Sequence, residues 1–373
     1  MSRSLSARRL VSVGAVGVLM ALSLSACGSD TDDGDGGSDG GAKKVGVILP
    51  DAVSSPRWEA NARPSLQAAF DAAGVESTIT NADGDVAKFG STCDAMINEG
   101  VSVLIIVNLD SESGAACLKK AAAAGIPSID YDRLTLGGGA SYYVSFDNVG
   151  VGRLMGEGLT KCLDDAGKTK ANIVYINGKP TDNNAALFKS GYEEALQPKI
   201  DSGDYKLVGD QTGEWDATVA GKAFEQIFAA QNGKVDGVVS ANDTMAGGII
   251  ARLKANGLAG KVPVTGQDAS VEGLQRVLNG QQCMTVYKNT NLEAKAVSDL
   301  AIALINGDTD AADAMVTGTV PDTVSGEDIP SVLAAPEAIY KDGVAKVIAD
   351  GFQTKEAVCT GAFAKLCADN GVQ

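Results

Sequence analysis

The sequence predicts an α/β protein with two Rossmann-like lobes, each built around a mainly parallel sheet. Short apolar runs alternate with helical stretches along most of the chain, which is typical of βα units joined by right-handed crossovers. The run 101–107 is apolar except for Ser102, as expected of a strand buried on both faces of a sheet. The alternation occurs in two similar runs of about five βα units, which favours two lobes over one oversized sheet.

The period of the apolar residues and the turn residues between the runs locate each element. In the first half, helices are predicted at 58–73, 86–99 and 112–124, and strands at 45–50, 75–80, 101–107, 126–131 and 142–146. In the second half, helices are predicted at 149–163, 185–196, 217–230, 244–256, 271–279 and 292–305, and strands at 171–176, 206–209, 237–240, 262–266 and 283–287. From Thr309 onward the pattern is weak, and only a helix at 341–349 is predicted.

These elements suggest how the chain divides. We assign residues 44–146 plus 289–315 to an N-terminal lobe and residues 147–288 plus 316–373 to a C-terminal lobe. No low-complexity linker lies between them. Several short crossings are therefore expected to connect the lobes, an arrangement that suits a hinge.

Composition limits what the chain can do. Of its 373 residues, 45% are hydrophobic and 21% are charged, which is typical of a soluble globular protein. The net charge of −16 argues against a nucleic-acid partner, because the phosphate backbone has the same sign. The absence of histidine excludes Ser-His-Asp and Cys-His catalysis and every His-containing zinc site. No Cys-x-x-Cys spacing occurs, so no metal and no redox cofactor is expected.

The N-terminus is typical of an export signal. Arg3, Arg8 and Arg9 form a basic segment, and residues 10–24 form an apolar one that is too short for a good membrane span. The sequence Leu24-Ser-Ala-Cys27 then resembles a bacterial lipobox.

That resemblance implies a lipoprotein signal peptide at residues 1–26 and a lipid on Cys27. The alternative is an ordinary signal peptide beside an incidental cysteine. Residues 27–43 are rich in Gly, Asp and Ser, which predicts a disordered tether. We therefore expect an extracytoplasmic protein that its lipid anchors to the outer face of the cell membrane.

The six other cysteines form an even set, which in an exported chain predicts disulfides. Six cysteines allow fifteen pairings, and the sequence does not decide among them. One choice joins Cys359 to Cys367, which are close in sequence, and Cys93 to Cys117, which fall on consecutive predicted helices. That choice leaves Cys162 with Cys283.

Polar side chains follow nearly every predicted strand at its carboxyl end, where open α/β sheets bind ligands. Asp132-Arg133 is the most informative pair, because one carboxylate and one planar fork of donors suit the vicinal hydroxyls of a sugar. An ion pair that merely closes a loop is the alternative. An Asp or Asn before a helix is by itself more often a cap than a ligand contact, but a Trp or an Arg there is not. The set across both halves predicts one shared cleft.

At this point the chain resembles the type 1 periplasmic sugar-binding proteins of ABC importers, and most closely their D-xylose-binding members. The matching segments are collinear and similarly spaced, and they run from about Lys44 to beyond Ile305. They are 56–58, 129–133, 145–148, 182–188, 208–211, 240–244, 246–248, 266–269 and 284–288. The tail after about Thr309 resembles the family less clearly, and the cysteines depart from the xylose-binding pattern.

The resemblance implies two lobes joined by three hinge strands that close on one monosaccharide and present it to a membrane permease. It implies a monomer, no catalytic residue and no cofactor. The ligand-binding residues that it implies are Arg57, Trp58, Asp132, Arg133, Asn148, Asn184, Trp215, Asn242, Asp268 and Lys288. The charged and amide groups would bind the hydroxyls, and the two indoles would lie on the apolar faces of the ring. D-Xylose is the first expectation, with other pentoses, glucose, galactose or a cyclitol as alternatives.

Three other functions make different demands on the sequence. A glycosidase needs a carboxylate pair, but Arg and Lys neighbours keep carboxylates ionised instead of raising a pKa. A sugar-responsive gene regulator needs an N-terminal helix-turn-helix where this chain has an export signal. A surface sensor that feeds a signalling receptor is compatible with the sequence and stays open.

Overall fold

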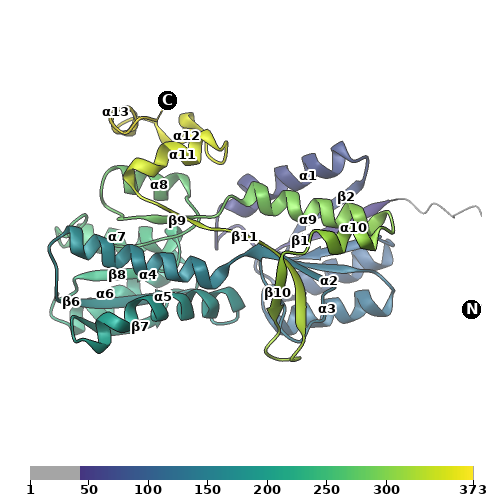
Figure 1. Ribbon diagram of the computed structural model, residues 1–373, viewed down its shortest axis with the longest axis horizontal. Coiled ribbons are helices and arrows are strands. Elements are labelled where there is room, and N and C mark those ends of the chain that lie inside the picture. The colour runs from purple at the N-terminus through teal and green to yellow at the C-terminus, as the bar shows by residue number, and fades with distance from the viewer. Residues whose placement is uncertain (1–42, 373) are drawn as a thin grey trace, which may run out of the picture. The chain divides into compact units, whose positions relative to one another are not determined.

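The computed structural model describes residues 43–372, and its elements alternate between strand and helix as predicted (Figure 1). The α/β class with largely parallel sheets is therefore confirmed. The signal peptide, Cys27 and all but the last residue of the tether lie outside the described residues. Between Lys43 and Val372, no helix has the length and apolar content that a bilayer span requires.

The N-terminal lobe is built on a seven-stranded sheet with the order β10-β11-β5-β4-β3-β1-β2. Every neighbouring pair is parallel except β10 and β11, which are antiparallel. The strands are β1 (Lys44–Leu49), β2 (Glu76–Asn81), β3 (Val103–Ile106), β4 (Ser128–Tyr131), β5 (Tyr142–Phe146), β10 (Gly318–Pro321) and β11 (Asp328–Ala334).

Helices cover both faces of this sheet. They are η1 (Trp58–Ala62), α1 (Arg63–Ala72), α2 (Val86–Asn98), α3 (Ser111–Ala123), α9 (Thr290–Ile305) and α10 (Thr309–Ala314). Helices α1 and α9 lie on one side of the sheet, and α2 and α3 lie on the other (Figure 1). In β3, Val103 and Ile105 pack with α1 and α9, whereas Leu104 and Ile106 pack with α2 and α3. Successive strand residues point to opposite faces, so a strand covered on both sides is apolar throughout.

The C-terminal lobe contains a parallel sheet of order β7-β6-β8 and an antiparallel pair, β9 with β12. These strands are β6 (Ala171–Asn177), β7 (Tyr205–Thr212), β8 (Gly237–Ser240), β9 (Thr285–Tyr287) and β12 (Glu337–Ile339). The helices are α4 (Asn148–Asp165), α5 (Asn183–Asp201), α6 (Ala217–Ala230), α7 (Asp243–Ala255) and α8 (Val271–Leu278). The predicted strand at 262–266 was wrong: this segment makes only an isolated bridge, Val264 with Val238. Its amides and carbonyls nevertheless bond to both β8 and the segment before β9.

Two helices of the C-terminal lobe approach each other closely because glycine leaves room. A Cβ at Gly152 of α4 would overlap the backbone of Phe188 in α5, and one at Gly191 of α5 would overlap the backbone of α4. This contact fixes the N-terminal turn of α5, which carries Asn184 into the space between the lobes.

The chain crosses between the lobes at residues 146–148, 287–290 and 334–337, where one sheet ends and an element of the other lobe begins. The lobe assignment of the tail needs a correction. Residues 318–334 were assigned to the C-terminal lobe, but β11 pairs with β5 in the sheet of the N-terminal lobe. The final segment returns to the C-terminal lobe as β12, η2 (Lys341–Gly343), α11 (Val344–Ala349), α12 (Lys355–Val358) and α13 (Phe363–Asp369).

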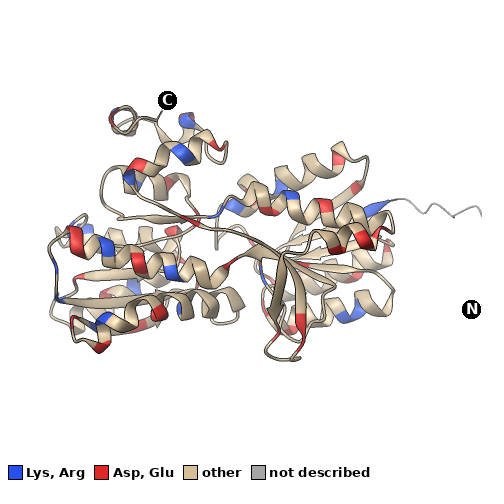
Figure 2. Cartoon of the chain, in the orientation of Figure 1, with Lys and Arg blue, Asp and Glu red and all other residues tan. Residues whose placement is uncertain are grey.

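Acidic and basic residues are interspersed over the helices of both lobes (Figure 2). Several form pairs one helical turn apart, for example Lys295 with Asp299 and Lys365 with Asp369. Such exposed pairs contribute only ~0.3–0.5 kcal/mol each, so they do not explain the fold. Other ion pairs are buried between the lobes, such as Arg133 with Asp182 and Lys288 with Asp132.

Three disulfides join the six cysteines of the described residues: Cys93–Cys117, Cys162–Cys283 and Cys359–Cys367. This is the choice set out from the sequence. Cys93–Cys117 links α2 to α3, and Cys359–Cys367 closes the C-terminal segment. Cys162–Cys283 links α4 to the segment that precedes β9, so it closes by far the longest loop.

Loop length should set how strongly two of these bonds stabilise the fold. The loops span 121 residues for Cys162–Cys283 and 8 for Cys359–Cys367. Chain entropy then gives about 5 and about 2.5 kcal/mol of stabilisation, respectively. We expect replacement of Cys162 and Cys283 by Ala to lower the free energy of unfolding more than replacement of Cys359 and Cys367. Urea unfolding without reductant measures both, and the opposite order would contradict the prediction.

Candidate functional site

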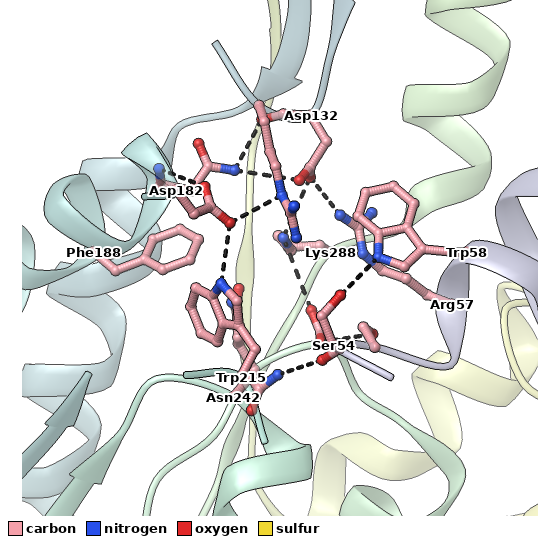
Figure 3. A pocket seen from close by; sticks show the side chains of 14 residues that line it. Ser54, Arg57, Trp58, Asp132, Asp182, Phe188, Trp215, Asn242 and Lys288 are labelled. Atoms are coloured by element: carbon pink, nitrogen blue, oxygen red, sulfur yellow. Dashed lines mark hydrogen bonds and ion pairs between the residues drawn. The ribbon is translucent and has the colours of Figure 1, made fainter. Parts of the chain in front are cut away.

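A cavity lies between the two lobes and is lined by fourteen residues. Side chains from both lobes point into it (Figure 3). Nine of the ten predicted ligand-binding residues line it: Arg57, Trp58, Asp132, Arg133, Asn184, Trp215, Asn242, Asp268 and Lys288. The fold therefore brings together residues that are far apart in the sequence, such as Arg57 and Lys288, which are 231 positions apart.

Asp132 of the N-terminal lobe contacts two of the cations that line the cavity. It follows β4, and its Oδ2 atom lies 2.6 Å from Nη2 of Arg57 and 3.6 Å from Nζ of Lys288. On its far side, Arg57 also lies 3.3 Å from Oε2 of Glu293 in α9. Arg57 enters the cavity just before the π-helical turn η1, an element that often marks a functional site.

Arg133 extends from the N-terminal lobe toward the C-terminal lobe. Its Nε atom lies 2.9 Å from Oδ2 of Asp182, an ion pair without the alignment of a hydrogen bond. Its Nη1 donates to the main-chain oxygen of Asn108 at 3.1 Å, which fixes the guanidinium plane. Asp182 caps α5 and also accepts from the indole nitrogen of Trp215 at 3.1 Å.

The amide of Asn184 connects the lobes. Its Nδ2 donates to the main-chain oxygen of Asp132 at 2.9 Å and to its Oδ1 at 3.2 Å. Asn148 is the predicted site residue that does not line the cavity. It lies behind Asn184, where its Nδ2 donates to Oδ1 of Asn184 at 3.0 Å and to the hydroxyl oxygen of Tyr143 at 3.1 Å. Asn148 therefore orients Asn184, because an amide whose oxygen is held can aim only its NH₂ group forward.

Asp268 and Asn242 form the opposite wall and also reach the N-terminal lobe. Asp268 accepts a hydrogen bond from the Ser55 hydroxyl at 3.0 Å through Oδ2, and its Oδ1 lies 3.8 Å from Nζ of Lys288. Asn242 donates to the main-chain oxygen of Ser54 at 3.0 Å. The lobes are thus in contact through the lining side chains, as expected of a closed arrangement.

Aromatic rings line the remaining surface. The Arg57 guanidinium lies over the Trp58 ring, 3.7 Å from its centroid. Trp215 meets Phe188 edge to face, with the ring centroids 6.3 Å apart. The cavity therefore combines charged groups with flat apolar walls.

Three lining residues have backbones in the left-handed region, which side chains other than glycine rarely adopt. The φ angles are 64° for Asp132, 59° for Trp215 and 98° for Asp268. Each conformation costs of order 1–3 kcal/mol and persists only where the surroundings enforce it. Strained backbone conformations are common at binding sites, and here the three strained residues all line the cavity.

The charges in the cavity are balanced. Three cations, Arg57, Arg133 and Lys288, face three carboxylates, Asp132, Asp182 and Asp268. Burial alone would raise the pKa of Asp132, but Arg57, Lys288 and Arg133 together lower it to about 2. Burial opposes the charge of Arg57 as well, yet Asp132 and Glu293 raise its pKa above the ordinary value. Asp132 is therefore an ionised acceptor and not a proton donor.

Glu293 behaves differently from Asp132. Its side chain is fully buried, and burial followed by the charge of Asp132 raises its pKa to about 8, against the smaller effects of Arg57 and Lys288. The raised pKa favours the protonated form of Glu293, and in that form Glu293 adds no charge behind the cavity wall.

Five lining residues were not among the predicted ligand contacts: Ser54, Ser55, Asp182, Phe188 and Gln267. Signals for three of them are present in the sequence. Gln267 follows the predicted strand at 262–266, and Asp182 lies just before the predicted helix at 185–196. Phe188 lies four residues after Asn184 on the same helix face. Ser54 and Ser55 lie in the loop before Arg57, and no local pattern points to them.

Residues 43–372 contain no group of three or more Cys, Asp or Glu side chains placed to hold a metal ion.

The model of the periplasmic binding protein domain matches residues 45–309, so the chain belongs to the periplasmic binding protein family. The resemblance to the sugar-binding proteins of ABC importers is confirmed.

Two relatives and one solved structure of similar proteins show which members of that family the chain resembles. The chain is 35% identical over 311 residues to the D-xylose-binding periplasmic protein of Escherichia coli K12, covering 83% of this chain and 90% of that protein. It is 32% identical to the multiple sugar-binding periplasmic receptor ChvE of Rhizobium radiobacter, covering 82% and 89%. A carbohydrate transporter solute-binding protein of Chloroflexus aurantiacus, solved with D-glucose, has a TM-score of 0.76 at 27% identity, covering 85% and 98%. These relatives are solute-binding proteins and not enzymes.

The proton on Glu293 should make stability depend on pH. Between pH 4.5 and about 8 the folded protein holds a proton that the unfolded chain has lost, so stability falls as pH rises through this range. The fall is at most ~1.4 kcal/mol per pH unit. Glu293→Gln removes this dependence, so the stability of the variant relative to the original protein should increase up to about pH 8 and stay constant above it.

Thermal unfolding from pH 5 to pH 9 measures the difference. Glu356→Gln, at an exposed carboxyl in α12, is the matched control and should give a flat difference. A flat difference for Glu293→Gln as well would show that the carboxyl is ionised in the folded protein.

Proposed function

We propose that this protein captures one uncharged monosaccharide, D-xylose, between its lobes and delivers it to the permease of an ABC importer. The observation that carries this proposal is the balanced cavity, in which three cations and three carboxylates from both lobes compensate each other. A charged ligand would leave a net charge buried, which costs several kcal/mol per ion. A neutral polyol adds no charge and exchanges hydrogen bonds with both kinds of group.

A sugar hydroxyl is both donor and acceptor, so it matches a cavity that offers both. Asp132 and Asp268 supply acceptors, whereas Arg133, Asn184 and Lys288 supply donors. Oε1 of Gln267 is a further acceptor, which receives no hydrogen bond from the described residues. Each buried polar atom left unpaired costs ~1–3 kcal/mol, so a sugar that pairs them all is favoured over one that does not.

The indoles of Trp58 and Trp215 and the ring of Phe188 supply apolar contact for the C–H faces of a pyranose. A pentose lacks the hydroxymethyl group of a hexose. Bulky Trp58 or Trp215 side chains can therefore exclude hexoses by a steric clash.

The sugar is expected to close the protein by bridging side chains from both lobes. Asp132 and Arg133 come from the N-terminal lobe, and Asn184, Asn242 and Asp268 come from the C-terminal lobe. A ligand that contacts both sets binds the closed form better than the open form, and it shifts the population accordingly. The closed monomer is then the form that the permease recognises.

D-Xylose is the first ligand to test because the D-xylose-binding protein of Escherichia coli is 35% identical over 83% of this chain. D-Glucose belongs in the same panel because the Chloroflexus aurantiacus protein was solved with it. We expect calorimetric titration of the soluble residues 43–373 to give saturable binding of D-xylose, weaker binding of D-glucose, and none of the charged analogue D-xylonate. Equal binding of D-xylonate, or no binding of any neutral sugar, would contradict the proposal.

Arg133→Ala should weaken D-xylose binding by ~100-fold or more, because it removes a donor and leaves Asp182 buried without its cation. Arg153→Ala is the matched control, since Arg153 lies on the exposed face of α4 in an ion pair with Glu194. The control should bind as the original protein does. An unchanged dissociation constant for Arg133→Ala, with the fold intact by circular dichroism, would place the sugar elsewhere.

We further propose that Cys27 carries the lipid that holds the protein at the outer face of the cell membrane, near its permease. The basic segment, the apolar segment and the lipobox-like residues of the sequence support this assignment. Cys27→Ala in the full chain should move the protein from the membrane fraction to the soluble extracytoplasmic fraction. Retention of the variant in the membrane fraction would contradict a lipid anchor at this position.

A further inference from the structure

A second buried carboxylate lies behind the wall of the cavity. Asp243 is the first residue of α7 and follows Asn242, whose side chain faces the N-terminal lobe. Asp243 itself is directed into the C-terminal lobe and is 1% exposed. Its Oδ2 accepts from the Ser270 amide at 2.9 Å and from the Thr285 hydroxyl at 3.1 Å, and its Oδ1 accepts from Nε2 of Gln282 at 2.6 Å.

These contacts surround one short segment, residues 267–270. The Asp243 amide donates to the Gln267 carbonyl at 3.0 Å, and the Ala269 amide donates to the Thr285 hydroxyl at 3.2 Å. Inside the segment, Asp268 and Ala269 are consecutive left-handed residues, with φ of 98° and 48°. Neither is glycine, so this turn persists only because its surroundings enforce it.

The fold leaves room for the Asp243 carboxylate by omitting two side chains. A Cβ at Gly266 would overlap Oδ1 of Asp243, and a Cβ at Gly273 would overlap Oδ2. Arg276 holds the same unit from the outside, because it donates to the main-chain oxygen of Asp243 at 2.6 Å and to Oε1 of Gln282 at 3.0 Å. The Asp243 carboxylate is therefore enclosed by the turn and by the residues that pack around it.

The turn decides where the Asp268 side chain points. Its carboxylate meets Ser55 of the N-terminal lobe and Lys288 of a crossing segment. We propose that Asp243 is a positioning residue for ligand binding, which locks the turn at 267–270 and so aims Asp268 into the cavity without touching the ligand. This inference rests on the proposed sugar site, since it assigns a role toward the ligand of that site.

Asp243→Asn is the direct variant, because it keeps the size of the side chain and changes one acceptor into a donor. Every group around the carboxylate is a donor or can serve as one, so the new NH₂ must face another donor. We expect D-xylose binding to weaken by ~10-fold or more. Asp268→Asn, which removes the carboxylate that Asp243 aims, should weaken binding by ~30-fold or more.

The double variant separates positioning from general destabilisation. If Asp243 acts through Asp268, adding Asp243→Asn to Asp268→Asn should change the dissociation constant by less than ~3-fold. Two independent effects would multiply instead, and a full further ~10-fold loss in the double variant would overturn the proposal.

Hydrogen exchange tests the turn without any sugar. In Asp243→Asn, the peptide that covers residues 266–272 should exchange at least ~10-fold faster than in the original protein, while it should be unchanged in Asp268→Asn. Unchanged exchange in Asp243→Asn overturns the proposal, whatever the titrations give. Failure of the unsubstituted protein to bind any sugar would contradict the proposed function alone, and the exchange result would still decide the role of Asp243.

Two further variants serve as a control and as a replacement for Asp243→Asn. Asp322→Asn changes another carboxylate that is 1% exposed, one that accepts from the Gly137 and Val324 amides beside the β10–β11 turn, away from the cavity. It should lower the melting temperature and leave the dissociation constant within ~2-fold. If Asp243→Asn does not fold, Thr285→Val replaces it in both experiments, because this isosteric change removes the hydroxyl between Asp243 and the Ala269 amide.

Discussion

The site depends on one constraint: charges buried between two lobes must compensate each other. Asp132 is at the centre of this compensation, 2.6 Å from Arg57 of its own lobe and 3.6 Å from Lys288 on a crossing segment. Removal of any one partner would leave an uncompensated charge away from water, which is more costly than never having buried the pair. The cavity is therefore lined by polar groups whose formal charges cancel, which is the basis of the proposal of an uncharged ligand.

The same constraint links ligand binding to the hinge. Lys288 lies between β9 of the C-terminal lobe and α9 of the N-terminal lobe, so a residue of the crossing itself contributes to the cavity. The crossing that leads from β5 into α4 carries Asn148, which orients Asn184 toward Asp132. Movement of one lobe relative to the other would change these distances directly. The C-terminal segment also contacts the N-terminal lobe, because Asn61 of η1 donates to the Phe352 carbonyl at 3.2 Å.

Precision in the cavity comes from strained turns held by buried networks. Asp132 and Asp268 both have positive φ, and a buried carboxylate lies close behind each turn. Asp130 accepts from the amide and hydroxyl of Thr135 after the first turn, and Asp243 accepts from Ser270 after the second. A turn held by so many contacts keeps its side chain in one direction, and such preorganisation lowers the cost of ordering a binding site.

The sequence alone is enough to predict the alternation of strand and helix, because strands buried on both faces, such as β3, are apolar throughout. It also determined that polar residues at strand ends meet, since parallel strands deliver their carboxyl ends to one edge. Nine of the ten site residues that the family resemblance implied line the cavity. Three features depend on the folded structure: the pairing of β11 with β5, the position of Asn148 behind Asn184, and the raised pKa of Glu293. Each of these depends on contacts between residues far apart in the chain, on burial or on a neighbouring charge, and none of them leaves a periodic pattern in the local sequence.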